Sequence, residues 1–207
     1  MKTFTEFVSD SLTEGHTNIL FESGMYSLGE DLERILNVFG EARIPFEIVG
    51  GTAVLAHILA AEKGRRSFLT KDIDLLMHRN NLVALLAAAE KAGYEGKRII
   101  GGYALVLPEQ DLGEAVHIIF VGEKPNSAYP VVNPPLEPDT KQLFGLRIPV
   151  APVKDLLTLK LNSKRAKDQV HIELLDRAGL ITPEIETHLH PELRSRLIEI
   201  RAGYEDR

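Results

Sequence analysis

Two aspartates in an otherwise apolar stretch limit the folds open to this chain more than any other feature. Asp72 and Asp74 lie two residues apart in DIDLLMH, which has the composition of a buried strand. Because side chains alternate along a strand, both carboxylates share one face. Such a pair costs free energy through desolvation and repulsion unless a cation lies between the acids. The stretch therefore predicts either a cation site or a solvent-facing surface neutralised by Arg65, Arg66 or Lys71.

A glycine pair lies upstream of these acids. The run FEIVGG predicts a strand that stops at Gly50 and Gly51, and residues 52–64 predict a helix that begins at Thr52. Glycine lets a ligand approach the backbone closely, and the free N–H groups at a helix start favour phosphate. Many proteins use such a turn, so it becomes informative only with the aspartates that follow one helix later. The combination suits a nucleoside triphosphate held at the glycines with Mg²⁺ on the aspartates.

The rest of the chain predicts an α+β fold, that is, an α/β mixed sheet with a helical C-terminal part. Helices are predicted at 28–44, 79–95, 153–163, 164–179 and 182–203, the last with a break at Pro191. A hairpin around Gly101 and Gly102 is predicted at 97–108, with further strands at 114–123 and 145–152. Residues 124–145 are rich in proline and predict an irregular connection. We therefore expect an N-terminal arm at 1–27, a mixed-sheet domain at 28–150 and a helical region packed on it at 151–207.

Composition excludes several classes of function. A net charge of −6 argues against blanket binding of nucleic acid or a membrane surface. Because the chain has no cysteine, it has no disulfide, thiolate metal site or cysteine nucleophile. Its apolar stretches are far shorter than the ~20 residues of a membrane helix, and its start lacks the apolar core of a secretory signal. We expect a soluble, cytoplasmic protein.

The stretch from 48 to 77, IVGGTAVLAHILAAEKGRRSFLTKDIDLLM, resembles the signature of the polymerase-β-type nucleotidyltransferase superfamily. That signature consists of an apolar residue before two glycines, then a helix, then Asp-x-Asp between apolar residues. The form with Arg66, Thr70, Asp72 and Asp74 is most similar to the bacterial abortive-infection-toxin-type nucleotidyltransferases.

A second stretch, residues 153–175, resembles the later signature of the same proteins. Its matching positions are Lys160 on one helix and Arg165, Lys167 and Asp168 on the next. Together, the two resemblances cover most of the chain in the expected order, and they imply the nucleotidyltransferase-like fold.

The resemblance also implies a chemistry. An NTP would bind with its phosphates at Gly50, Gly51 and Thr52, and Mg²⁺ (or Mn²⁺) would bind to Asp72 and Asp74. A nucleoside monophosphate would then pass to a hydroxyl of an RNA, a protein or a small molecule. The other nucleotide-binding residues implied are Arg66, Thr70, Lys160, Arg165 and Asp168. If the chain is toxin-like, a cognate antitoxin protein is an expected partner.

One position departs from the family pattern. Such enzymes carry a third carboxylate on a neighbouring strand, and the stretch that should supply it has His117 at that place. His117 can act as a metal ligand or general base, since imidazole titrates near pH ~6.5. It can also mark a lost activity, be a structural residue, or leave the acid's role to Glu114 or Glu123. Two functions stay open: an enzyme whose catalytic residues are Asp72, Asp74 and His117, and a catalytically impaired nucleotide-binding or regulatory module.

Other patterns carry less chemistry. Lys160, Lys164 and Lys167 form a basic stripe if one helix runs through them, which suits either phosphate binding or a solvated face. His188 and His190 lack the acidic or cysteine partners of a metal site. The absence of a G-x-G-x-x-G motif disfavours a Rossmann dehydrogenase, and protein-kinase motifs are missing too.

Overall fold

The computed structural model describes residues 25–62, 70, 72–108 and 114–205. The predicted arm up to residue 24 lies outside the described residues, as do Arg65, Arg66 and Lys71. Among the described helices, none combines the length and apolar character that crossing a membrane requires.

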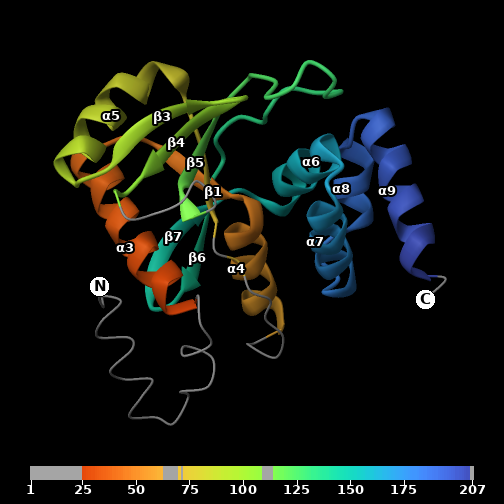
Figure 1. The fold of residues 1–207 in the computed structure, drawn as a ribbon. Coiled ribbons are helices and arrows are strands. Elements are labelled where there is room, and N and C mark those ends of the chain that lie inside the picture. Colours follow the sequence, from red (N-terminus) through yellow and green to blue (C-terminus); the bar gives the residue numbers. More distant parts are fainter. Residues whose placement is uncertain (1–24, 63–69, 71, 109–113, 206–207) are drawn as a thin grey trace, which may run out of the picture.

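A seven-stranded mixed sheet forms the centre of the molecule (Figure 1). Its strands are β1 (Phe46–Val49), β2 (Ile73–Met77), β3 (Glu95–Ile99), β4 (Gly102–Val106), β5 (Val116–Phe120), β6 (Asp139–Leu143) and β7 (Leu146–Val150). Their order across the sheet is β3-β4-β5-β2-β1-β7-β6. The β2–β5 and β1–β7 pairs are parallel, and the other neighbours are antiparallel. The mixed α/β fold class predicted from the sequence is confirmed.

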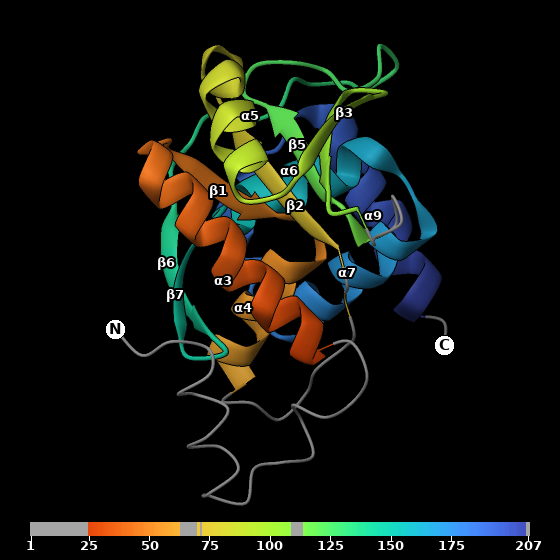
Figure 2. The ribbon, with the colours of Figure 1, turned by 60° about the vertical axis from the view of Figure 1, so that its left-hand side comes forward.

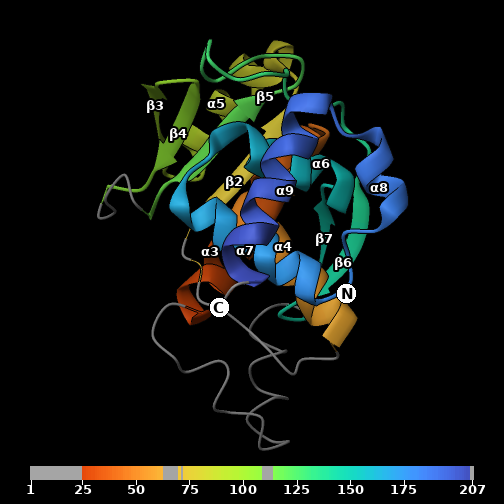
Figure 3. The same ribbon diagram turned by 90° about the vertical axis from the view of Figure 1, so that its right-hand side faces the viewer.

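Helices cover both faces of this sheet. On one face lie α3 (Met25–Ala42) and α5 (Leu82–Lys91), as Figure 2 shows. The other face carries α4 (Gly50–Glu62), α6 (Val153–Ser163) and α7 (Ala166–Arg177). Two further helices, α8 (Pro183–His188) and α9 (Pro191–Glu205), belong to the C-terminal helical layer and lie outward of the sheet (Figure 3).

Helix α4 lies between the sheet and the C-terminal helices. Four successive residues in it, Ala53, Val54, Leu55 and Ala56, are completely buried. A helix that is apolar all round is stable only when every side of it is covered. Its N-terminus is consequently held in the interior, at the point where β1 ends.

The proline-rich connection contains a strand that was not predicted. Residues 139–143 form β6, which pairs antiparallel with β7 through a turn at Phe144 and Gly145. Both turn residues have positive φ, 50° and 75°, as a two-residue hairpin with the right-handed twist requires. The prediction of an irregular segment up to residue 145 was therefore wrong for its last part. The strand was not predicted because its sequence, DTKQ, is polar. Such a sequence is tolerated because β6 is an edge strand with one solvent-facing side.

The basic stripe does not form as one helix. Helix α6 ends at Ser163, and Lys164 adopts a left-handed conformation with φ 54°. Arg165 is extended, and α7 begins at Ala166. The chain therefore changes direction between α6 and α7, shortly after Lys160. Residues 163–166 form this α6–α7 corner, which borders the site described below.

The boundaries of other predicted elements shift by a few residues. A 3₁₀ turn at Arg79–Asn81 precedes α5, which ends at Lys91 because Gly93 takes φ 87° and lets the chain turn into β3. The predicted hairpin around Gly101 and Gly102 is confirmed as β3–β4.

Candidate active site

The glycine turn and the acidic strand touch each other. Gly50 has φ 66°, a conformation that side chains rarely adopt, and a Cβ there would lie 1.9 Å from Asp74 Oδ2. A Cβ on Gly51 would lie 2.6 Å from Thr70 Oγ1. Both positions therefore need glycine, because the backbone itself forms the contact surface. Gly50, directly after β1, thus contacts the Asp74 carboxylate on β2, although more than twenty residues separate the two in sequence.

Asp74 faces His117 on the adjacent strand. Parallel pairing of β2 with β5 places the two residues in register, with 3.6 Å between Asp74 Oδ1 and His117 Nδ1. Burial opposes ionisation of Asp74, but His117, Lys160 and Lys167 outweigh it and hold the pKa of this carboxyl below its ordinary value. His117 thus occupies the strand position beside the aspartate where the family pattern has its third carboxylate.

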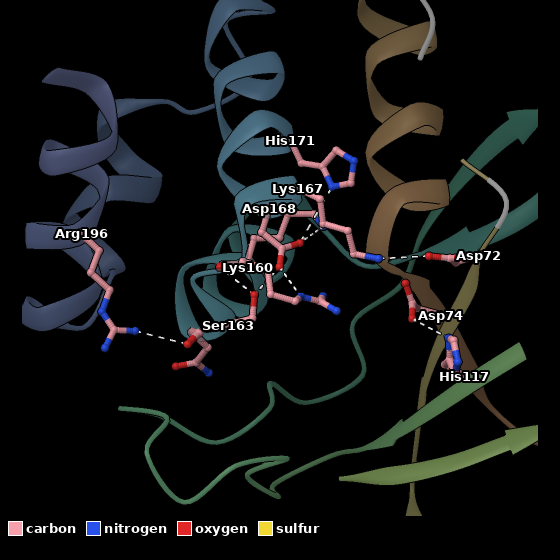
Figure 4. Close-up of polar contacts among 11 residues, drawn as sticks. Asp72, Asp74, His117, Lys160, Ser163, Lys167, Asp168, His171 and Arg196 are labelled. Carbon is pink, nitrogen blue, oxygen red and sulfur yellow. Dashed lines mark hydrogen bonds and ion pairs between the residues drawn. The ribbon is translucent and has the colours of Figure 1, made fainter. Parts of the chain in front are cut away.

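Asp72 lies just before β2 and is fixed from two sides. Thr52, in the first turn of α4, donates a hydrogen bond of 2.9 Å from Oγ1 to the Asp72 carbonyl oxygen. The Asp72 carboxylate accepts a hydrogen bond from Lys167 Nζ at 3.1 Å (Figure 4). Lys167, on the first turn of α7, therefore joins the C-terminal helices to the acidic pair.

A buried ion pair occupies the corner between α6 and α7. Lys160 Nζ lies 2.9 Å from Asp168 Oδ1, and the two side chains are only 4% and 1% exposed. Arg165 Nε contacts the other Asp168 oxygen at 2.8 Å, and Ser163 Oγ donates to that same oxygen. Burial lowers the pKa of Lys160 in spite of Asp168 and Asp74. Burial raises the pKa of Asp168, but contacts with Lys160, Ser163 and Arg165 lower it by more. The pKa of this carboxyl therefore lies below its ordinary value.

A cleft of about 290 Å³ joins these two groups. From the sheet it is lined by Val49, Gly50, Asp74 and His117. From the α6–α7 corner it is lined by Lys160, Ser163, Arg165 and Asp168. Figure 4 shows the two groups facing each other, with the Lys160–Asp168 network on the helices and the Asp74–His117 pair on the strands. The arrangement places cations opposite a carboxylate across one space, which suits an anionic ligand accompanied by a cation.

The acidic pair fits a hard divalent cation of the Mg²⁺ type. Magnesium is usually held by one or two carboxylates and completes its shell with water and substrate phosphates. Asp72 and Asp74 offer two such carboxylates at the start of β2; Asp74 lines the cleft, whereas Asp72 is not among the lining residues and pairs with Lys167. No cluster of three or more His, Cys, Asp or Glu side chains placed to hold a metal occurs in the part of the chain that the structure describes. The donor set therefore suits a cation bound together with phosphate, and not one enclosed by protein alone.

The other predicted residues have varied positions. Arg66 lies outside the described residues, while Thr70 packs on Gly51 as described above. Glu123 does not replace His117, because it pairs with Arg79, with 2.5 Å between Arg79 Nη2 and Glu123 Oε2. Glu114 is exposed and is not among the residues that line the cleft.

Sequence reasoning missed His171. It lies one turn after Asp168 on α7, and its Cε1 would be 3.4 Å from a Cβ on Gly51. Its Nδ1 lies 3.9 Å from Asp168 Oδ1. Burial and Lys160 lower the pKa of His171 to about 4, so the ring is neutral at pH 7. The i, i+3 spacing from Asp168 was the available signal.

Known structures resemble this fold, although no protein-family model matches the chain and no curated protein does. The antibiotic-resistance factor ANT(2'')-Ia in solution superposes with a TM-score of 0.55 at 18% identity, over 84% of this chain and 93% of that one. An antigenic nucleotidyltransferase-like protein from Paracoccidioides brasiliensis gives a TM-score of 0.50 at 18% identity, over 84% and 87%. A crystal structure of ANT(2'')-Ia with adenylyl-2''-tobramycin gives 0.45 at 16% identity, over 84% and 96%. The chain therefore has the nucleotidyltransferase fold.

Proposed function

We propose that this protein is a nucleotidyltransferase that moves a nucleoside monophosphate from an NTP to an acceptor hydroxyl. One observation carries the proposal. Asp74 lies against the Gly50 turn and faces Lys160 and Arg165 across a single cleft. A phosphate chain needs backbone N–H groups, cations and a metal-binding carboxylate in one place, and this cleft offers all three.

Different residues of the cleft would bind the triphosphate and the metal ion. The triphosphate would lie at the turn of Gly50, Gly51 and Thr52, of which Gly50 lines the cleft while Gly51 and Thr52 are buried. Its further anionic groups would be neutralised by Lys160 and Arg165, which Asp168 holds in place. Asp72 and Asp74 would hold Mg²⁺ or Mn²⁺, which supplies Lewis-acid polarisation of the α-phosphate when it is bound. In the absence of such an ion, Lys167 neutralises Asp72.

The acceptor oxygen would attack the α-phosphorus, and the bond from this phosphorus to pyrophosphate would break. His117 would take the proton that the acceptor hydroxyl loses. It lines the cleft beside Asp74, and imidazole accepts a proton near neutral pH. The acceptor is an RNA, a protein or a small molecule; a toxin role with a protein antitoxin, and a cytoplasmic location, are proposals that rest on the sequence alone.

A direct test is incubation of the protein with each labelled NTP, Mg²⁺ or Mn²⁺, and separate RNA, protein and small-molecule fractions of a cell extract. We expect label in one fraction and release of pyrophosphate, both abolished by Asp74→Asn. Glu114→Gln, at an exposed position before β5, should leave transfer unchanged. Absence of label in every fraction with all four nucleotides would contradict transfer.

A second function is a nucleotide-binding module without catalysis, and the specific observation in its favour is His117 in the place of a carboxylate. A module would bind NTP without releasing pyrophosphate, and His117→Asp would not create turnover. Turnover by the wild-type chain that Asp74→Asn abolishes would instead establish the enzyme.

A further inference from the structure

The cleft has a second end that the phosphate chemistry leaves unused. Beyond Asp74 and Lys160 it continues between uncharged side chains from the β3–β4 hairpin, β5 and the segment that follows β5. These are Ile99, Ile100, Ile119, Pro125 and Tyr129. Because the strand order is β3-β4-β5-β2-β1, the hairpin residues lie at one end of the cleft, the apolar end, and Gly50 and Asp74 at the other, and Leu156 and Leu159 of α6 add apolar lining beside Lys160. A ligand that fills the cleft meets charged and apolar side chains.

The wall of the apolar end is built from two segments in contact. Gly101, at the tip of the β3–β4 hairpin, has φ 79°, and a Cβ there would lie 2.7 Å from Pro125 Cβ. The hairpin tip thus rests on the segment that carries Tyr129. Ile100 beside it is 97% exposed, more than any other large apolar side chain described. Its side chain is therefore available to cover an apolar part of a ligand in the cleft.

A buried hydrogen-bond acceptor without a partner belongs to the same end of the cleft. Asn133 lines the cleft but is only 2% exposed. Its Nδ2 donates to the Phe120 carbonyl at 2.9 Å, which fixes the orientation of the amide because a carbonyl can only accept. Its Oδ1 has no hydrogen-bond partner. A buried acceptor of this kind is stabilised by a ligand that brings an N–H group to it.

The cleft has the size of a small-molecule site. Its volume of about 290 Å³ is close to the low end of the ~300–1,000 Å³ that such sites span. A single ligand with an anionic part at Lys160 and Arg165, and a flat apolar part that carries an N–H donor, has the chemistry of a nucleotide.

We infer that the apolar end is the nucleobase subsite, in which Tyr129 and Ile100 cover the base and Asn133 Oδ1 accepts a hydrogen bond from its exocyclic amine. This inference rests on the proposed function. Adenine and cytosine carry such an amine, at N6 and N4. Hypoxanthine and uracil carry an oxo group at the same position. Two hydrogen-bond acceptors, this oxo group and Asn133 Oδ1, would then face each other. The subsite therefore favours ATP and CTP over ITP and UTP.

Calorimetric binding of ATP, ITP and inorganic tripolyphosphate, each with Mg²⁺, tests this inference. We expect ATP to bind roughly three- to tenfold more tightly than ITP, the worth of one hydrogen bond. Asn133→Ala should remove that difference, and CTP should exceed UTP in the same way. Tyr129→Ala should weaken ATP and ITP alike by at least about fivefold, the worth of a lost stacking contact, and leave tripolyphosphate unchanged.

Val132→Ala is a matched control, because Val132 lies beside Asn133, is 46% exposed and does not line the cleft. It should change the binding of none of the three ligands. Equal binding of ATP and ITP by the wild-type chain would overturn the role of Asn133, even if Asn133→Ala does not fold. Tripolyphosphate weakened as much as ATP by Tyr129→Ala would overturn the base subsite. The proposed function fails on a different result, namely no binding of tripolyphosphate or of any NTP.

Discussion

The carboxylate of Asp74 occupies the space that a side chain at residue 50 would need, since a Cβ on Gly50 would lie 1.9 Å from Asp74 Oδ2. This contact joins the start of α4 to the start of β2. It makes the helix N-terminus and the Asp74 carboxylate two parts of one surface.

Gly50→Ala should abolish nucleotide binding and destabilise the fold. Two effects add: alanine costs about 1–2 kcal/mol at a left-handed φ, and its Cβ displaces Asp74. Gly122→Ala is the matched control, because Gly122 has φ 72° with nothing near its missing Cβ. We expect urea unfolding to show a loss of about 1–2 kcal/mol for Gly122→Ala with unchanged ATP binding. Equal stability and equal ATP binding in the two variants would refute the importance of the contact.

Lys160→Met should destabilise the protein by about 3 kcal/mol, because it leaves Asp168 buried without its main partner. The double variant Lys160→Met, Asp168→Leu should recover most of that loss in urea unfolding. It should nevertheless not bind NTP, since the cation that we propose to face the phosphates is gone. A double variant that binds ATP normally would show that the ion pair serves the fold alone.

The free energy of unfolding should fall as pH rises above about 5, because Glu47 loses its proton. Glu47 is fully buried on β1, and burial, aided by Asp155, raises its pKa to about 7. Since the folded state binds this proton more tightly than the unfolded state, its stabilising effect is present below the unfolded pKa near 4.5. It is lost as pH rises through 7. Asp155, with a pKa raised to about 6 chiefly by burial, adds to this slope at lower pH.

Glu47→Gln should remove most of that slope. At pH 8 the variant should be more stable than the wild type by up to about 3 kcal/mol, the equivalent of the pKa difference. Chemical unfolding at pH 5, 6, 7 and 8 measures this. Glu90→Gln, at an exposed position on α5, is the control and should leave the slope unchanged. A wild-type stability that rises from pH 5 to 8 would contradict the prediction.

His117→Asp should lower the Mg²⁺ concentration needed for ATP binding by about tenfold. It would place a hard oxygen beside Asp74 where the wild type has a nitrogen, and Mg²⁺ prefers oxygen. Calorimetry with ATP at several Mg²⁺ concentrations gives the shift, and His117→Asn separates the effect of charge from that of shape. If His117→Asp leaves the Mg²⁺ dependence of ATP binding unchanged, residue 117 does not lie beside the bound metal.

Local patterns in the chain allowed much of the fold to be predicted. The period of two along DIDLLMH, the glycines after FEIV and the glycine pair of the β3–β4 hairpin each depend on a few neighbouring residues. The resemblance to the nucleotidyltransferase pattern implied that His117 lies on a strand beside the aspartates, and the parallel register with Asp74 agrees with it. The roles of these residues in catalysis stay predictions.

Long-range contacts account for what could not be predicted. The strand β6 exists because β7 offers it a partner, although its own sequence is polar. The break between α6 and α7 was predicted, but the left-handed conformation of Lys164 and the burial of Lys160 against Asp168 were not. Tyr129 and Asn133 line the cleft because their segment packs against the hairpin tip and β5, contacts that no local pattern encodes.

Local residue patterns were enough to establish that a glycine turn ends one strand and that a pair of carboxylates begins the next, one helix later, because the alternation of a strand and the freedom of glycine are properties of a few adjacent residues. Only the tertiary structure decided that Asp74 fills the space at Gly50, that Lys160 and Asp168 are buried opposite it, and that an apolar end adjoins them. Burial and pairing depend on every element that covers a residue, and those elements come from distant parts of the chain.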